Sequence, residues 1–396
     1  MATHLWRCRL LLTILAAGLS TSCSEDREPG GARQVWRFAI EESTGSVQHT
    51  YALRFKELIE ERSEGNVEVV VYPYGTLGTS TQLTEQLNMG VIEFAMASPG
   101  SLGKFIPELQ VFLLHFVLSE DDDVSRRVLA DPELLAMIDE LYAEKGLKLL
   151  AIFPEGEMVW TTKGEVREPG DFAGVKMRVM TSPILLDAYD AYGASATPLP
   201  YSEVYSALQL NMIDGQVNPI FAIERQKFHE VTSWLTFPQH AQLITTTAAN
   251  RSFFESLPES ERRMVEEVIA ELNDEIFRRQ RQLQFEMLKQ IIRDKQRKEQ
   301  PLHVAGDLKR VLGTLDASER LELVEENPFL ELSPPLTDEE RAAFRRLSQA
   351  VRETYLEIGG TRSQAILKKL AELKAREEGR VETIREGDGS TSGPDG

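Results

Sequence analysis

The sequence predicts an α/β protein with two lobes and one long helix that spans both of them. Strand-like and helix-like segments alternate twice along the chain, a pattern typical of mostly parallel sheets covered by helices. The 396 residues exceed what one hydrophobic core usually organises. An apolar helical stripe also continues from about residue 257 to 297. At about 1.5 Å per residue it would span roughly 60 Å, which is longer than a small domain.

The first alternation begins with a buried strand at 35–40. A helix follows and ends at Gly65, and its apolar residues recur at helical spacing: Val47, Tyr51, Phe55, Leu58 and Ile59. A β-branched strand at 67–72, a helix at 80–89 and a strand at 91–97 complete the unit. These elements predict a mostly parallel sheet.

The second alternation has the same character. Its expected elements are a helix at 131–146, strands at 147–153 and 175–180, a helix at 183–193, an extended segment at 194–198, and a strand at 213–218. Ser202 is expected to cap a further helix that ends near Leu210. The long helix begins after Pro258, and a coiled coil is the alternative for it, although its apolar period is not a strict seven. Residues 341–373 are also helical in pattern.

These elements divide the chain into five parts. We predict a signal peptide at 1–22, a tether at 23–33, lobe I at 34–155 plus 244–283, lobe II with the C-terminal helices at 156–243 plus 284–375, and a disordered tail at 376–396.

The N-terminus predicts export. Arg7 and Arg9 precede the apolar stretch 10–19, which is too short to cross a bilayer, because a spanning helix needs about 20 residues. The small residues 20–22 directly precede Cys23, an arrangement that resembles a bacterial lipobox. We therefore expect a periplasmic protein anchored to a membrane only by a lipid on Cys23, with simple cleavage of the signal as the alternative.

Composition argues against several function classes. The net charge of −19 disfavours nucleic acid, which requires clustered Lys and Arg, and also disfavours electrostatic attachment to an anionic membrane. The sequence contains no nucleophile elbow, phosphate-binding loop or paired metal-binding histidines. We therefore expect no enzymatic activity, no cofactor and no metal.

Two side chains have the chemistry to bind a carboxylate. Arg178 lies near the carboxyl end of an apolar strand, where ligands bind in open α/β sheets, and its planar fork suits a carboxylate. Asn218 precedes Pro219, so its backbone is biased to extended geometry and its amide is free to project. The alternatives are a surface salt bridge for Arg178 and a structural turn for Asn218.

The same region resembles the solute-binding subunits of tripartite ATP-independent periplasmic (TRAP) transporters, the DctP family. The resemblance covers roughly residues 33–300 and rests on several words that are specific in combination: Asp171-Phe172-Ala173-Gly174-Val175-Lys176-Met177-Arg178-Val179, Tyr192-Gly193-Ala194, Thr197-Pro198-Leu199-Pro200-Tyr201-Ser202-Glu203-Val204-Tyr205, Asp214-Gly215-Gln216-Val217-Asn218-Pro219 and Val71-Tyr72-Pro73-Tyr74-Gly75-Thr76-Leu77-Gly78.

The resemblance implies a two-lobed periplasmic-binding-protein fold. It also implies that Arg178 and Asn218 bind the ligand carboxylate and that Tyr201 lines the site. The expected function is capture of a small organic carboxylate by lobe closure and delivery to integral membrane TRAP permease subunits. The alternative is a ligand-sensing co-receptor for a membrane sensor.

Departures from the family pattern suggest the ligand's character. Met158 stands where many members have a second Arg, and Ser98 replaces a polar residue common in the first lobe. With Trp160 nearby, we expect a monocarboxylate with an apolar or aromatic body, unless Trp160 is a core residue. His115 replaces a usual Pro and either lines the cleft or is a hydrogen-bonded core histidine.

Two further expectations complete the sequence-based account. Glu42 follows the first strand at a cleft-facing position and is expected to add a polar contact. The helix segment 282–298 could support a homodimer, with a solvated helix face as the alternative.

Overall fold

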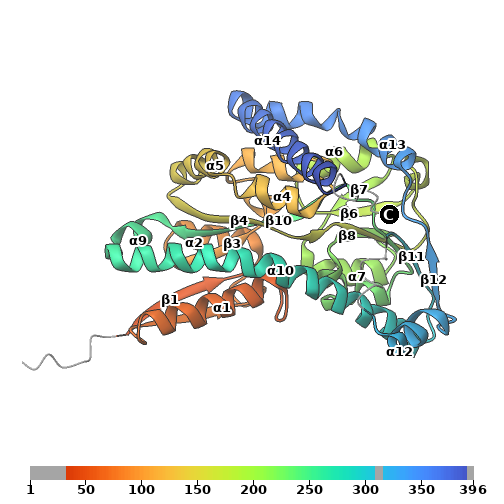
Figure 1. Ribbon diagram of the computed structural model, residues 1–396, viewed down its shortest axis with the longest axis horizontal. Helices are drawn as coiled ribbons and strands as arrows, with labels where there is room; N and C mark the ends of the chain where they lie inside the picture. The colour runs from red at the N-terminus through yellow and green to blue at the C-terminus, as the bar shows by residue number, and fades with distance from the viewer. Residues whose placement is uncertain (1–32, 308–314, 390–396) are drawn as a thin grey trace, which may run out of the picture.

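The computed structural model describes residues 33–307 and 315–389 and contains two sheets, one in each lobe (Figure 1). The predicted signal peptide, most of the tether with Cys23, and residues 390–396 lie outside the described residues. Within the described part, no helix is both long enough and apolar enough to cross a membrane.

Lobe I is built around a five-stranded sheet of order β2-β1-β3-β10-β4. Its elements are β1 (Gln34–Ala39), α1 (Val47–Arg62), β2 (Val67–Tyr72), α2 (Ser80–Asn88), β3 (Phe94–Ala97), α3 (Pro99–Leu102), η1 (Pro107–Leu113), α4 (Asp122–Leu129), α5 (Pro132–Glu144), β4 (Leu147–Glu157), β10 (Gln242–Asn250) and α9 (Arg251–Ser256). Strand β1 pairs in parallel with β2 and β3, whereas β10 is antiparallel to both β3 and β4.

Lobe II is built around a seven-stranded sheet of order β12-β11-β9-β5-β8-β6-β7. Its elements are β5 (Val159–Thr162), η2 (Pro169–Phe172), β6 (Lys176–Val179), α6 (Pro183–Ala191), β7 (Ser195–Pro198), η3 (Tyr201–Glu203), α7 (Val204–Gln209), β8 (Gly215–Asn218), α8 (Ile220–Arg225), η4 (Phe228–Glu230), β9 (Trp234–Thr236), β11 (Leu302–Ala305), α12 (Ala317–Arg320), η5 (Leu321–Glu325) and β12 (Leu330–Ser333). Only β5 is antiparallel to its neighbours among these paired strands. The predicted α/β class with mostly parallel sheets is confirmed.

The two reversed strands are the ones that join the lobes. Strand β4 leaves lobe I and continues into β5 of lobe II, and β9 leaves lobe II and continues into β10 of lobe I. Each crossing therefore starts at the carboxyl end of a strand that is parallel to most of its sheet. The carboxyl ends of both sheets consequently face the junction between the lobes, which is where open α/β sheets bind ligands.

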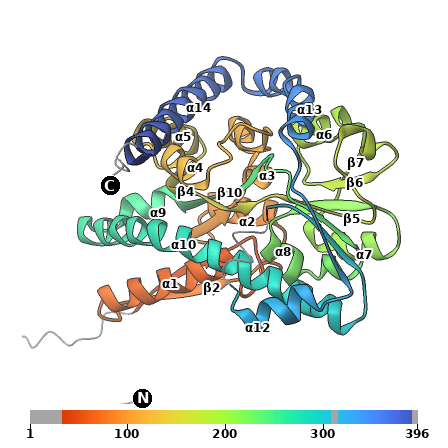
Figure 2. The same cartoon turned by 45° about the vertical axis from the view of Figure 1, so that its right-hand side comes forward.

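Helix α10 (Glu259–Arg297) runs along both lobes, as the apolar stripe predicted (Figures 1 and 2). Its 39 residues form one helix that packs against α1 and β4 of lobe I and against α8 and η5 of lobe II. Buried Val265 and Leu272 lie in its first half, and buried Ile291 in its second half. The helix is therefore a common support for the two lobes.

The C-terminal helices correct part of the sequence-based account. Helices α13 (Asp338–Ser348) and α14 (Val351–Gly389) follow β12, and α14 is kinked at Gly360, whose φ of 56° favours glycine. Helix α14 packs against η1, α4 and α5 of lobe I and α6 of lobe II, so it does not belong to lobe II alone. The tail predicted to be disordered from 376 is helical as far as Gly389, because buried Glu377 ties it to the protein.

The expected N-cap at Ser202 is also wrong. Ser202 lies within the η3 turn, and α7 begins only at Val204 without a side-chain cap. An N-cap residue needs extended backbone geometry, which in this segment falls at Pro200.

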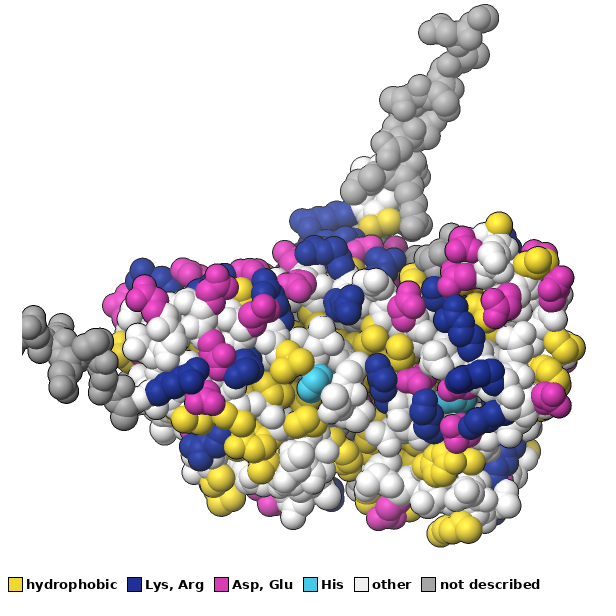
Figure 3. All heavy atoms as spheres, turned by 90° about the horizontal axis from the view of Figure 1, so that it is seen from below, with side chains coloured by type: hydrophobic (Ala, Val, Ile, Leu, Met, Phe, Trp, Pro, Cys, Tyr) yellow, Lys and Arg dark blue, Asp and Glu magenta, His cyan; other side chains and the backbone are white. Residues whose placement is uncertain are grey.

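The surface carries both signs of charge despite the net charge of −19. On the face shown in Figure 3, Lys and Arg side chains are interspersed with Asp and Glu. Neither sign forms a continuous patch across this face.

Replacing Glu377 tests the ordered C-terminal helix. Its carboxylate pairs with Arg127 Nε at 3.1 Å, Arg376 Nε at 3.0 Å and Arg380 Nη1 at 2.8 Å. We expect Glu377→Ala to lower the free energy of unfolding by about 1–3 kcal/mol in urea denaturation, because charged hydrogen bonds are lost. Glu372→Ala, on the exposed face of the same helix, should change it by less than about 0.5 kcal/mol. Equal effects of the two variants would contradict the docking of this segment.

Candidate functional site

A cavity of about 220 Å³ lies between the two lobes at the carboxyl ends of their strands. Lobe I contributes residues that follow β1, β2 and β3, and lobe II contributes residues from β6, β8 and the segment before η3. The lining residues include Glu42, Gln48, Tyr74, Ser98, Arg178, Met180, Leu199, Tyr201, Asn218 and Leu243. The topology thus brings five of the predicted site residues together: Glu42, Ser98, Arg178, Tyr201 and Asn218.

Arg178 is the only cation in the described lining of this cavity, and it is 3% exposed. Its Nε and Nη2 donate to the backbone carbonyl of Leu199, at 3.0 and 2.7 Å. No carboxylate of the described residues forms a salt bridge with it. Burial lowers the pKa of Arg178 to about 10, so the guanidinium remains charged at neutral pH. It is therefore a fixed, buried positive charge without an ionic partner in the part of the chain that the structure describes.

Asn218 and Tyr201 flank this guanidinium. Asn218 ends β8 and its Nδ2 donates to Gln216 Oε1, which holds the amide at the cavity wall. The Tyr201 hydroxyl donates to Glu42 Oε2 of lobe I at 3.4 Å, and its ring meets that of Tyr74 edge-on at 5.7 Å. Tyr201 therefore connects the two lobes across the cavity.

Two adjacent carboxylates of lobe I have different roles. Glu41 accepts hydrogen bonds from the Ser98 backbone N–H at 2.7 Å and from the Ser101 hydroxyl, so it fixes the start of α3. Glu42 is 6% exposed, and its carboxylate accepts hydrogen bonds from the Tyr201 hydroxyl and from the backbone N–H of Ser43. Burial, followed by the nearby charges of Glu155 and Glu41, raises the pKa of Glu42 well above its usual value.

Glu155 is a third carboxylate in this cluster, and sequence analysis missed it. Its Oε1 accepts hydrogen bonds from Gln48 Nε2 at 2.8 Å and from the Thr245 hydroxyl, while its buried Oε2 has no hydrogen-bond partner among the described residues. Burial raises the pKa of Glu155 to about 7. The predicted strand ended at Phe153, but β4 continues to Glu157, and this extension carries Glu155 into the junction.

Met158, Trp160 and His115 are not among the cavity's lining residues, which corrects the expectation that they contact a ligand there. Trp160 is fully buried in lobe II and donates its indole N–H to the Tyr189 hydroxyl at 2.9 Å. His115 Nδ1 hydrogen-bonds the Tyr192 hydroxyl at 2.7 Å. Met158 and His115 instead line a small void of about 20 Å³ that shares Ser98, Met180 and Leu243 with the cavity.

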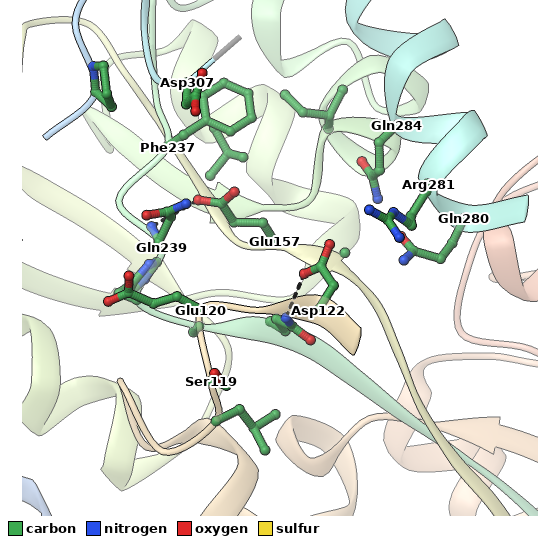
Figure 4. Close-up of a pocket in the computed structure, with 18 of the residues that line it drawn as sticks. Ser119, Glu120, Asp122, Glu157, Phe237, Gln239, Gln280, Arg281, Gln284 and Asp307 are labelled. Carbon is green, nitrogen blue, oxygen red and sulfur yellow. Dashed lines mark hydrogen bonds between the residues drawn. The ribbon is translucent and has the colours of Figure 1, made fainter. Parts of the chain in front are cut away.

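A second cavity of about 280 Å³ is lined by the crossing segments and α10 (Figure 4). Gln280, Arg281 and Gln284 of α10 project toward Glu157 and Asp122, and Gln242 Nε2 donates to Asp122 at 2.9 Å. None of the predicted site residues is among its described lining residues. Among the described residues, no group of three or more His, Cys, Asp or Glu could hold a metal ion.

Comparison with known proteins identifies the family of the chain. The chain matches the family model for DctP, bacterial extracellular solute-binding protein family 7, over residues 38–302. It is 35% identical over 366 residues to the ectoine/5-hydroxyectoine-binding periplasmic protein UehA of Ruegeria pomeroyi, covering 91% of this chain and 96% of that protein. It is 34% identical over 363 residues to the ectoine-binding periplasmic protein TeaA of Halomonas elongata, covering 91% and 94%.

Solved structures show the same fold. The ectoine-binding protein of the TeaABC TRAP transporter of Halomonas elongata has a TM-score of 0.73 and 34% identity, covering 86% of this chain and 100% of that one. A TRAP solute-binding protein from Desulfovibrio salexigens with bound orotic acid has a TM-score of 0.73 and 26% identity, covering 87% and 99%. The chain is therefore a member of the bacterial extracellular solute-binding proteins of family 7, as its sequence motifs predicted.

Proposed function

We propose that this protein captures a small zwitterionic carboxylate of the ectoine type and delivers it to a TRAP permease. One observation carries the proposal. A buried guanidinium on one wall of the interlobe cavity and buried carboxylates on the other have no ionic partner among the described residues. A ligand with a negative and a positive end would neutralise both walls at once.

The negative end of such a ligand fits the lobe II wall. The Arg178 guanidinium uses Nε and Nη2 for Leu199, and its Nη1 has no partner among the described residues. A carboxylate here would accept a charge-assisted hydrogen bond from Arg178, worth about 1.5–3 kcal/mol net. It would also accept a hydrogen bond from the Asn218 side-chain amide.

The positive end fits the lobe I wall. Glu42 faces the cavity, and its one side-chain hydrogen bond among the described residues is the weak one from Tyr201. A simple anion beside Glu42 would meet either a like charge or a carboxyl held neutral by its raised pKa. A delocalised ring cation, such as the one ectoine carries, would remove this conflict. This favours a zwitterion over the plain monocarboxylate that the sequence analysis expected.

The middle of the cavity supports a compact, partly apolar body. Met180, Leu199 and Leu243 line it together with the rings of Tyr74 and Tyr201. The apolar character expected from Met158 and Trp160 is thus supplied by other residues. The volume of about 220 Å³ suits a ligand of small-ring size.

Lobe closure would supply the selectivity of capture. A ligand shifts the balance of open and closed forms only through its different affinity for the two. The lobe II wall alone offers Arg178 and Asn218, whereas the closed form adds Glu42 and Tyr74 from lobe I. The resemblance to transporter subunits supports delivery to a permease over a receptor role, and supports a binding protein without turnover.

The location of the protein is part of the same proposal. The named relatives UehA and TeaA are periplasmic, which supports a periplasmic site of action. The small residues before Cys23 support a lipid anchor there. A homodimer through residues 282–298 stays a prediction.

Removing the Arg178 charge should abolish high-affinity binding. With ectoine as the probe in titration calorimetry, we expect Arg178→Gln to weaken binding at least about 100-fold, since a buried charged bond is lost without replacement. Arg263→Gln, on the exposed face of α10, is the control and should bind as the parent chain does. Unchanged affinity of Arg178→Gln would remove Arg178 from the site.

Neutralising Glu42 should change which charge type is bound. We expect Glu42→Gln to weaken ectoine binding about 10-fold or more, because the ring cation loses its counter-charge. Orotate, a ring acid without a positive end, should bind no more weakly to Glu42→Gln than to the parent chain. If Glu42→Gln weakened the binding of ectoine and orotate equally, Glu42 would shape the cavity without distinguishing ligands by their charge.

A further inference from the structure

The buried Glu155 carboxylate lies behind the lobe I wall of the cavity, where it is bonded to the lining residue Gln48. It is fully buried, its Oε1 is held by Gln48 and Thr245, and its Oε2 has no hydrogen-bond partner within residues 33–307 and 315–389. Its backbone carbonyl also accepts a bond from Gln284 Nε2 of α10 at 2.8 Å, so the residue is fixed in place. A buried carboxylate with a bare oxygen requires either a proton or a nearby cation.

The groups around it provide no cation. Glu42 and Glu41 interact with it electrostatically from the segment after β1, and Tyr201 does so from η3. Gln48 of α1 and Thr245 of β10 are neutral. Among the described residues, no Lys, Arg or His forms a salt bridge with Glu42 or Glu155. Arg178, the cation of the opposite wall, is held by Leu199.

We propose that the buried Glu42 and Glu155 carboxyls hold a proton in the ligand-free protein and that the positive end of the ligand displaces it, so that capture releases a proton to solvent. This inference rests on the proposed zwitterion-binding function and assigns Glu155 a role in it. Glu42 would touch the cation, whereas Glu155 would act behind it as a positioning residue that sets the protonation of the pair.

The raised pKa values of Glu42 and Glu155 set the direction in which ligand affinity changes with pH. The pKa of Glu155 is raised to about 7 and that of Glu42 is raised in the same sense, mainly by burial. Below about pH 7 the ligand-free pair is therefore protonated, and a bound cation must expel the proton. Affinity for a cation-bearing ligand should rise with pH up to about 7 and level off above it.

The raised pKa of Glu155 also predicts how the stability of the ligand-free protein depends on pH. A carboxyl whose pKa is raised by folding binds its proton more tightly in the folded state. The contribution of Glu155 to stability is therefore present at low pH and declines as the pH rises through about 7. Glu155→Gln, which mimics the protonated form and keeps the bonds to Gln48 and Thr245, should remove this decline.

Calorimetry with ectoine measures the proton directly. Titrations at pH 6 in buffers of different ionisation enthalpy should show release of close to one proton per ectoine bound by the parent chain. Affinity should fall by up to about tenfold per pH unit between pH 7 and 5.5. Glu155→Gln should release almost none and show a flat profile, whereas Glu267→Gln, on the exposed face of α10, should behave as the parent.

Two different failures can be told apart. Ectoine binding without proton release in the parent chain would overturn the inference and leave the proposed function standing. Absence of ectoine binding would overturn the proposed function. The pH dependence of ligand-free stability would then decide whether the two buried carboxyls hold a proton. Identical pH–stability curves for the parent and Glu155→Gln would overturn the proposed protonation of Glu155. If Glu155→Gln did not fold, Glu42→Gln would serve in the stability measurement.

Discussion

The structure of this site depends on keeping opposite charges buried but apart. Arg178 on lobe II and Glu42 with Glu155 on lobe I lie out of water, where an unpaired charge is costly, yet they form no salt bridge with one another. The guanidinium is held by the Leu199 carbonyl, and Glu155 by Gln48 and Thr245. The proposed zwitterionic ligand would neutralise both walls when it occupies the space between them.

The fold explains how these charges come to face each other. Arg178 and Asn218 lie on parallel strands β6 and β8, and Glu42 follows β1. The strands β5 and β10 that cross between the lobes are the reversed ones, so the carboxyl ends of both sheets meet at the junction. Helix α10 supports both lobes, and its Gln284 anchors the backbone of Glu155 beside the crossing. Helix α10 is thereby joined through strand β4 to the carboxylates beside the cavity.

Local sequence patterns were sufficient for much of this. Apolar periodicity predicted α10, and the position of Arg178 near the end of an apolar strand predicted that it lies at the lobe junction. Contacts between distant segments were not predictable in this way. Trp160 packs into the lobe II core because Tyr189 and Phe172 surround it, and Glu155 is buried because β4 continues past Pro154. Helix α14 extends beyond residue 376 because Arg127, from another part of the chain, pairs with Glu377.

The most direct test of this account is a crystal structure of the protein with ectoine bound. The account predicts the ectoine carboxylate within about 3 Å of the Arg178 guanidinium and the Asn218 amide, with the ring cation facing Glu42. Ectoine bound with its carboxylate away from Arg178, or bound only in the cavity beside Gln280 and Gln284, would contradict it.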